Sequence, residues 1–313
     1  MYRIVLSRLL LAIPLLFVVS FLTFLLVNLI PGDPAAELLG PQASPEQIDA
    51  LRDQLGLNLP ITTQYWNWLT SALSGNLGAS IYDGSSVSQA LSGQLPVTIS
   101  LVGLTILFSS VVGVAFGVLS AVGRGRIARL ADVISLVGYA IPNFWLGLVL
   151  IAAFAVSIPL FPATGYVDFA ASPGEWFRSL VLPVLTLGGP VVANIAKQTR
   201  ESMLDAMGRD YIKVLRANGA SERSIVWKHA LKNAAAPVIT VIGLISVGLT
   251  AGAVVVEQVF VLPGLGSLAV SATTRHDLPV ITGVVVYFTL IVIVVNLAVD
   301  LAYGWLNPKE RKS

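Results

Sequence analysis

The sequence has no cysteine among its 313 residues and only two histidines. The missing thiols exclude a disulfide framework, a cysteine nucleophile and a cysteine-ligated metal site. Two histidines leave little material for a metal cluster, so no metal site is predicted. Charge is also scarce, since Asp, Glu, Lys and Arg make up 12% of the residues, against about 25% in a typical soluble domain. An ordinary soluble globule is therefore excluded.

Hydrophobic residues are abundant, at 55% of the chain with a mean hydropathy of +0.81. Together with a net charge of only +2, this excludes an intrinsically disordered chain. The basic residues stand between apolar runs and not along one soluble face, which argues against nucleic-acid binding. The composition predicts a single transmembrane domain over residues 1–313, in contact with membrane lipid.

Six runs of 18 to 26 residues contain no Asp, Glu, Lys or Arg. They cover residues 9–30, 97–122, 133–156, 179–196, 237–256 and 280–299. A hydrocarbon core about 30 Å thick needs roughly 20 helical residues, and lipid satisfies no backbone hydrogen bonds, so each run is expected to be a helix. The first run is too long for a signal peptide and is expected to be retained. The predicted fold is an all-α polytopic membrane protein with six spans.

Lys and Arg are distributed unevenly among the connections between these runs. Sixteen of the 19 lie before the first run, in the second and fourth connections, and after the last run. Only Arg52, Arg178 and Arg275 lie on the opposite side. Because cytoplasmic loops carry the excess of basic residues, both termini and the loop 197–236 are expected in the cytoplasm.

The outer loop, residues 31–96, is long enough to contain its own helices. The segment Ser44–Gln47 combines an N-cap serine, a proline at the first helical position and a capping-box glutamine, and Gly56 provides a stop. A second short helix is expected over Ile61–Ser74, with aromatic residues of the kind found at membrane interfaces. The loop either caps the bundle or shares in docking a partner and lining the entrance.

The cytoplasmic loop 197–236 carries eight basic and four acidic residues with apolar residues among them. The fourth span is expected to continue as a helix towards Asn218 and to end at Gly219, a C′ glycine. Ser221 is expected to cap a second short helix with Glu222 near its positive end. Pro237 is expected to open the fifth span.

Such a helix–glycine–short helix unit suits a docking device. The alternative is a solvated basic loop beside anionic lipid headgroups. The apolar Trp227 next to the glycine break favours docking, because a merely solvated loop has no need of it.

Two glycine pairs indicate where helices pack closely. Gly113 and Gly117 are four residues apart, as are Gly248 and Gly252, so each pair lies on one helix face. Small residues at this spacing allow helix backbones to approach each other in membranes. Close packing is expected at both pairs, with a role in gating as the alternative.

The sequence carries no motif for a reaction or an energy source. It has no P-loop, no H-E-x-x-H and no G-x-S-x-G. Ionisable residues are absent from the six runs, and the nearest lie at their edges: Asp132, Glu257 and Asp300. An ion-coupled secondary transporter normally has such groups near the midplane, so that class is disfavoured, although backbone carbonyls can still bind sodium. His229 and His276 are expected in loops as structural or solvated residues. The chain is predicted to be a non-catalytic transport or channel subunit driven by another protein.

Short motifs along the chain make the prediction more specific. They are residues 31–34, 55–57, 64–66, 75–78, 141–147, 217–223, 229–233, 257–260, 263–266, 277–279, 300–303 and 307–308. In this order, and on six apolar runs, they resemble the permease subunits of bacterial dipeptide, oligopeptide and nickel ABC importers. The long outer loop is similar to one subunit type of that family.

The resemblance implies a type I ABC importer permease fold in the bacterial inner membrane. It implies a heterodimer with a homologous second permease, two ATPase subunits that use ATP and Mg, and an extracytoplasmic solute-binding protein. No cofactor is expected on this chain. The cargo is expected to be di- or oligopeptides, with nickel or another small solute as the alternative.

The same resemblance implies that the short helix after Gly219 docks on an ATPase subunit. The residues assigned to this coupling are Ala217, Gly219, Ala220, Ser221, Glu222, Arg223, Ile225 and Trp227. The family motif usually begins with Glu-Ala-Ala, whereas this chain has residues 213–215 as Lys-Val-Leu, so a salt bridge from that Glu is not expected. Asn143, Phe144 and Glu257 are the candidates for the pathway or gate.

Overall fold

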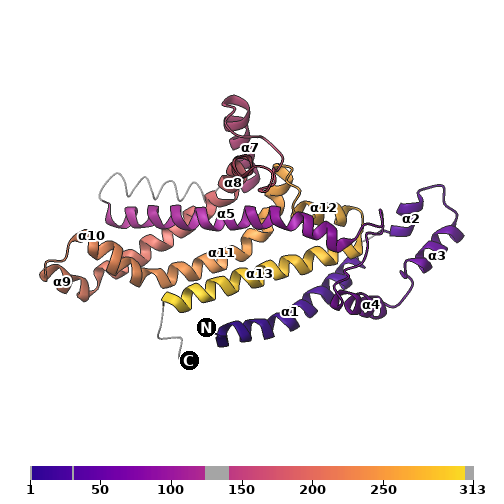
Figure 1. Cartoon of the computed structure of the whole chain (residues 1–313), viewed down its shortest axis with the longest axis horizontal. Coiled ribbons are helices and arrows are strands. Elements are labelled where there is room, and N and C mark those ends of the chain that lie inside the picture. Colours follow the sequence, from indigo (N-terminus) through magenta and orange to yellow (C-terminus); the bar gives the residue numbers. More distant parts are fainter. Residues whose placement is uncertain (1, 30–31, 124–140, 307–313) are drawn as a thin grey trace. The chain divides into compact units, whose positions relative to one another are not determined.

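The computed structural model describes residues 2–29, 32–123 and 141–306. Within these ranges the regular structure is helical, apart from one bridge between Ala79 and Ser86 (Figure 1). The all-α prediction is confirmed. Several predicted features lie outside the described ranges. They are the basic residues Arg124, Arg126 and Arg129, Asp132, the start of the predicted third span and the motif 307–308.

The helices follow one another with few long connections. Those of the first half are α1 (Tyr2–Val27), α2 (Pro34–Leu39), α3 (Pro45–Gln54), α4 (Ile61–Leu73) and α5 (Val87–Val122). Those of the second half are α7 (Asn143–Ile151), the π-helix η1 (Ala152–Ser157), α8 (Pro173–Gly208), α9 (Asp210–Ala217), α10 (Glu222–Ser224), the π-helix η2 (Ile225–Ala230), α11 (Leu231–Val259), α12 (Leu265–Thr274) and α13 (Leu278–Leu306).

Five helical stretches within the described residues are long and apolar enough to cross a membrane. They are Val5–Val27, Val87–Val122, Pro173–Gly208, Glu222–Val259 and Leu278–Gly304. Each contains one of the predicted runs and extends it at one or both ends, except that the first run continues to residue 30. The third run is described only from residue 141, where Asn143–Ser157 forms a shorter apolar helix. The third predicted span, residues 133–156, therefore stays a prediction.

The chain divides into two compact units. Unit 1 contains Met1–Leu6, Ser100–Leu262 and Val292–Ser313, and unit 2 contains Ser7–Ile99 and Pro263–Ile291. Unit 1 includes the loop between α8 and α11, and unit 2 includes the outer loop. Each candidate site below lies within one unit.

The helices of the outer loop begin where the sequence indicates. Ser44 accepts a hydrogen bond from the Gln47 backbone N–H at 3.4 Å, and the Gln47 side chain accepts from the Ser44 N–H at 2.9 Å. This confirms the capping box. The second helix, α4, matches its predicted range to within one residue. The short helices α2 and α12 are not anticipated, although Asp33 caps α2 and Pro34 stands at its first position, a signal like that of Ser44 and Pro45.

The first glycine pair brings α5 and α8 into close contact. A Cβ at Gly113 would stand 2.8 Å from Ile195 Cβ, and one at Gly117 would stand 2.6 Å from the Ala196 carbonyl oxygen. Neither position has room for a side chain, so the predicted packing is confirmed here. At the second pair, Gly252 lies against Leu187, whereas a Cβ at Gly248 would meet no described atom within 4 Å.

Two boundaries in the loop 197–236 differ from expectation. Helix α8 ends at Gly208 and not near Asn218, because Arg209 adopts an extended backbone with ψ 150° before α9 begins. Asp210 then stands in the first turn of α9, where a negative charge favours a helix start. Pro237 does not open a helix either: it lies inside α11, which continues from α10 and η2.

Gly117→Ala tests the α5–α8 contact. The new Cβ would meet a backbone oxygen that cannot move unless the helices separate, so we expect a loss of about 1–3 kcal/mol of stability. Gly103→Ala is the matched control, because it lies on the same helix with no described atom within 4 Å, and Ala favours a helix by about 0.5–1 kcal/mol over Gly. Thermal unfolding in detergent measures both, and equal midpoints would contradict the close contact.

Candidate functional site

The connection between α8 and α11, residues 209–230, is called the elbow here (Figure 1). Its helix α9 ends in a Schellman motif at Gly219. The Gly219 N–H donates to the Arg216 carbonyl at 3.0 Å, and the Ala220 N–H donates to the Leu215 carbonyl at 3.0 Å. Gly219 has φ +77°, a left-handed conformation that favours glycine. The predicted C′ glycine is confirmed.

No described atom lies within 4 Å of the place where a Gly219 Cβ would stand. The glycine is therefore required by the backbone conformation and not by packing. A side chain at this position would point into open space, which leaves room for a partner to approach the turn.

Ser221 starts the next helical segment as expected. Its side-chain oxygen accepts a hydrogen bond from the Ser224 N–H at 3.4 Å, and Glu222 stands in the first turn. Beyond Ser224, the chain continues without a break through η2 into α11. The second helix of the elbow is therefore not a separate short helix, but the beginning of a helical stretch that runs from Glu222 to Val259.

A salt bridge joins the two sides of the turn. Arg216 donates from Nε to one Glu222 carboxylate oxygen at 2.6 Å and from a terminal nitrogen to the other at 3.2 Å. Both side chains are about half exposed. The hydrogen bond to Glu222 raises the pKa of Arg216, as the hydrogen bond to Asp205 raises that of Arg209. The ion pair connects α9 to α10. It was not anticipated from the sequence, although Arg216 and Glu222, with opposite charges, stand three residues before and after Gly219.

A buried apolar cluster packs against the elbow. It joins the end of α5 and the end of α8 to α9, η2 and the start of α11. Its buried members are Val118, Met203, Ala206, Ile212, Ile225, Val226, Ala230 and Ala234. The cluster holds the elbow against the ends of two transmembrane helices.

Two of the predicted coupling residues belong to this support. Ile225 is fully buried in the cluster, and Ala220 packs against it. The Ile225 side chain lies beneath the surface in this structure, and its predicted contact with an ATPase subunit stays a prediction. Its place in the cluster makes it a residue that positions the elbow.

The remaining predicted coupling residues lie on the exposed side of the elbow. They are Ala217, Gly219, Ser221, Glu222, Arg223 and Trp227. Trp227 is 49% exposed although it is the largest apolar residue of the segment. We call these six exposed residues together the elbow face.

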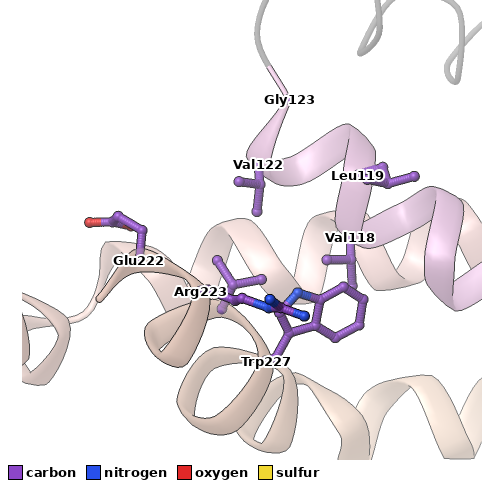
Figure 2. A pocket seen from close by; sticks show the side chains of 8 residues that line it. Val118, Leu119, Val122, Gly123, Glu222, Arg223 and Trp227 are labelled. Atoms are coloured by element: carbon purple, nitrogen blue, oxygen red, sulfur yellow. The ribbon is translucent and has the colours of Figure 1, made fainter. Parts of the chain in front are cut away.

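A cavity of about 360 Å³ adjoins the elbow face (Figure 2). The end of α5 contributes Val118, Leu119 and Val122, and the elbow contributes Arg223 and Trp227. In Figure 2 the Trp227 indole points towards Val118, whereas Glu222 points away. The cavity is open and mainly apolar, so its walls are suited to an apolar side chain and not to a metal or nucleotide.

Tyr211 and Asn233 connect α9 to the start of α11. The Asn233 side chain donates to the Tyr211 hydroxyl at 3.1 Å and to the His229 carbonyl at 2.8 Å. His229 itself lies on the π-helix η2 and not in a loop, which corrects its predicted position. His276 does lie in a turn, where its Nδ1 is 3.1 Å from Glu37.

The structure does not bring the three pathway candidates to one surface. Asn143 begins α7 and approaches Gly252 on α11. Phe144 is 52% exposed, whereas Glu257 is fully buried in α11. The roles of these three residues in the pathway or gate stay predictions.

Comparison with known proteins covers nearly the whole chain. The family described as "Binding-protein-dependent transport system inner membrane component" matches residues 113–312, and its N-terminal companion matches residues 1–102. A probable peptide ABC transporter permease protein of Sinorhizobium fredii is 41% identical over 308 residues, with 98% of each chain covered. The glutathione transport system permease protein GsiC of Escherichia coli K12 is 38% identical over 312 residues, with 99% of each covered.

The fold is also similar to a solved structure. A chain of the MetNI methionine ABC transporter in an inward-facing conformation superimposes with a TM-score of 0.58 at 19% identity. The match covers 70% of this chain and 97% of that chain, and it supports the type I permease fold. The chain belongs to the family of inner membrane components of binding-protein-dependent transport systems, and is a multi-pass, non-catalytic permease subunit of an ABC importer.

Proposed function

We propose that this chain forms half of the translocation pathway of an ATP-driven importer of di- or oligopeptides. A homologous second permease completes the pathway, two ATPase subunits bind on the cytoplasmic side, and an extracytoplasmic solute-binding protein delivers the cargo. ATP and Mg belong to the ATPase subunits, and this chain binds no cofactor. The peptide cargo is supported by relatives of nearly equal length that are named as peptide and glutathione permeases, since glutathione is itself a short peptide.

The elbow carries the mechanical part of the proposal. The elbow packs on the buried cluster, and its second half is the start of a helical stretch of 38 residues, Glu222–Val259. This stretch is about 57 Å long at 1.5 Å per residue. A force applied to Trp227 and its neighbours therefore acts directly on a membrane-spanning helix. Closure of the ATPase dimer would pull the elbow face and tilt α11 between inward-open and outward-open states.

The charge pattern supports the orientation that this mechanism needs. The elbow lies in the loop with eight basic residues, on the side that carries sixteen of the 19 Lys and Arg residues. Under the positive-inside rule this side is cytoplasmic, where ATP is available. Both termini lie on the same side in this arrangement.

Reconstitution of the complete transporter tests the function. Liposomes containing this chain, its second permease and the ATPase subunits, with ATP and Mg inside, are expected to accumulate a labelled di- or tripeptide supplied with the binding protein outside. Liposomes that lack the ATPase subunits are the control. Uphill uptake by this chain without ATPases, driven by an ion gradient, would replace the proposal by a secondary transporter, and accumulation of Ni²⁺ but no peptide would change the cargo.

Gly219→Val tests the elbow as the point of coupling. A β-branched residue in a left-handed conformation is strained by about 1–2 kcal/mol, so we expect assembly to survive and peptide uptake to fall by roughly tenfold. Gly219→Asn is the matched control, because asparagine tolerates this conformation and the space around the site is open. Unchanged uptake in the valine variant, at equal membrane abundance, would argue against coupling through this turn.

Exchange of the elbow ion pair separates an internal role from a partner contact. Arg216→Glu places two acids on opposite sides of the turn, and we expect peptide uptake to fall because α9 and α10 repel each other. The double variant R216E/E222R restores opposite charges and is expected to recover most of the uptake. If the double variant stays as poor as the single one, these two residues act by contacting another protein.

A further inference from the structure

Helix α4 of the outer loop is attached to the side of a membrane-spanning helix. Tyr65 is 3% exposed, and its ring lies edge-on to Phe17, Phe21 and Phe24 of α1, with centroids 5.6, 5.2 and 5.4 Å away. In Figure 1, α4 lies beside the C-terminal part of α1. Helix α4 and the part of α1 that it contacts both belong to unit 2.

Hydrogen bonds fix the depth of this contact. The Tyr65 hydroxyl donates to the Phe17 carbonyl at 3.2 Å and lies 3.0 Å from the Ser20 hydroxyl, which is also buried. Phe17 precedes the end of the span at Val27 by ten residues, or about 15 Å of helix at 1.5 Å per residue. Half of the hydrocarbon core is also about 15 Å. Tyr65 therefore lies level with the half of α1 that ends at Val27, and not above it.

The composition of α4 permits this depth. Its thirteen residues contain no Asp, Glu, Lys or Arg. Two of its polar side chains are bonded to carbonyls: Gln64 donates to Leu57 and Leu59, and Thr70 donates to Trp66 and Asn67. Thr62, Thr63 and Asn67 are exposed, and Trp68 Nε1 has no hydrogen-bond partner among the described residues. A helix satisfies its own backbone groups and can enter a bilayer, whereas an irregular loop cannot.

The outward side of α4 carries two large apolar residues that the contact with α1 leaves uncovered. Trp66 is 62% exposed and Leu73 is 81% exposed. On α1 itself, Leu22 and Leu26 are 46% and 61% exposed, and the helical spacing places them on the face opposite to Phe17, Phe21 and Phe24. The contact of Tyr65 with Phe17 places this part of α4 beside a membrane-spanning helix.

We propose that α4 is embedded in the leaflet that contains the C-terminal half of α1, with Trp66 and Leu73 in contact with lipid. The outer loop is then anchored within the membrane by α4 and projects α2 and α3 from it. The inference holds for any cargo and does not depend on the proposed function.

The absence of cysteine makes a direct test possible. The variants Trp66→Cys and Leu73→Cys each carry one thiol for a nitroxide spin label in the full chain, reconstituted in liposomes with its partner subunits. Leu26→Cys is the control on the span, and Ala50→Cys, on the exposed side of α3, is the control in water. Collision of the label with oxygen, which concentrates in lipid, is compared with collision with a water-soluble nickel chelate.

Both α4 labels are expected to match the Leu26 control, with oxygen collisions exceeding those of the nickel chelate. A profile like that of Ala50 would place α4 in water and overturn the proposal. Low collision with both agents would show a protein surface over α4, from the second permease or the binding protein, and would also overturn it. If Trp66→Cys fails to fold, Leu73→Cys alone decides, because Leu73 is the more exposed residue of the two and contributes less to packing.

Discussion

The close approach of α5 and α8 at Gly113 and Gly117 determines where the elbow stands. Only hydrogen occupies the space between these glycines and the backbone of α8. Directly beyond Gly117, Val118 joins Met203 and Ala206 in the apolar cluster under the elbow. Any residue that separated the two helices would therefore also loosen the support of α9 and η2. Helix packing inside unit 1 and the position of the candidate coupling surface thus depend on one contact.

The elbow combines a rigid support with an exposed face. Residues that point inwards, such as Ile225, anchor it to the ends of α5 and α8. Trp227, two residues later, is half exposed. The Schellman turn at Gly219 and the ion pair between Arg216 and Glu222 hold the two sides in one geometry. Under the proposed function, a partner bound to the elbow face would move α11 with it, because these contacts hold the elbow in one geometry.

The outer loop uses a different physical means of attachment. A tyrosine packed among three phenylalanines, with its hydroxyl bonded to the backbone of the span, joins α4 to α1. A salt bridge between Arg52 and Asp33, at 2.7 Å, ties α3 to the chain that precedes α2, and this hydrogen bond keeps the pKa of Asp33 low. The membrane-side attachment is apolar and the water-side attachment is ionic, as the two environments require.

The sequence by itself determined the helical class, the apolar runs and the capped starts at Ser44 and Ser221. These features depend on local chemistry: lipid leaves backbone groups without partners, and a serine hydroxyl supplies one at a helix start. Only the tertiary structure decided that Ile225 is buried while Trp227 is exposed, that α8 stops at Gly208, and that α11 begins before Pro237. The first of these depends on which neighbouring helix covers a side chain, and residues that are adjacent in the sequence carry no record of that neighbour.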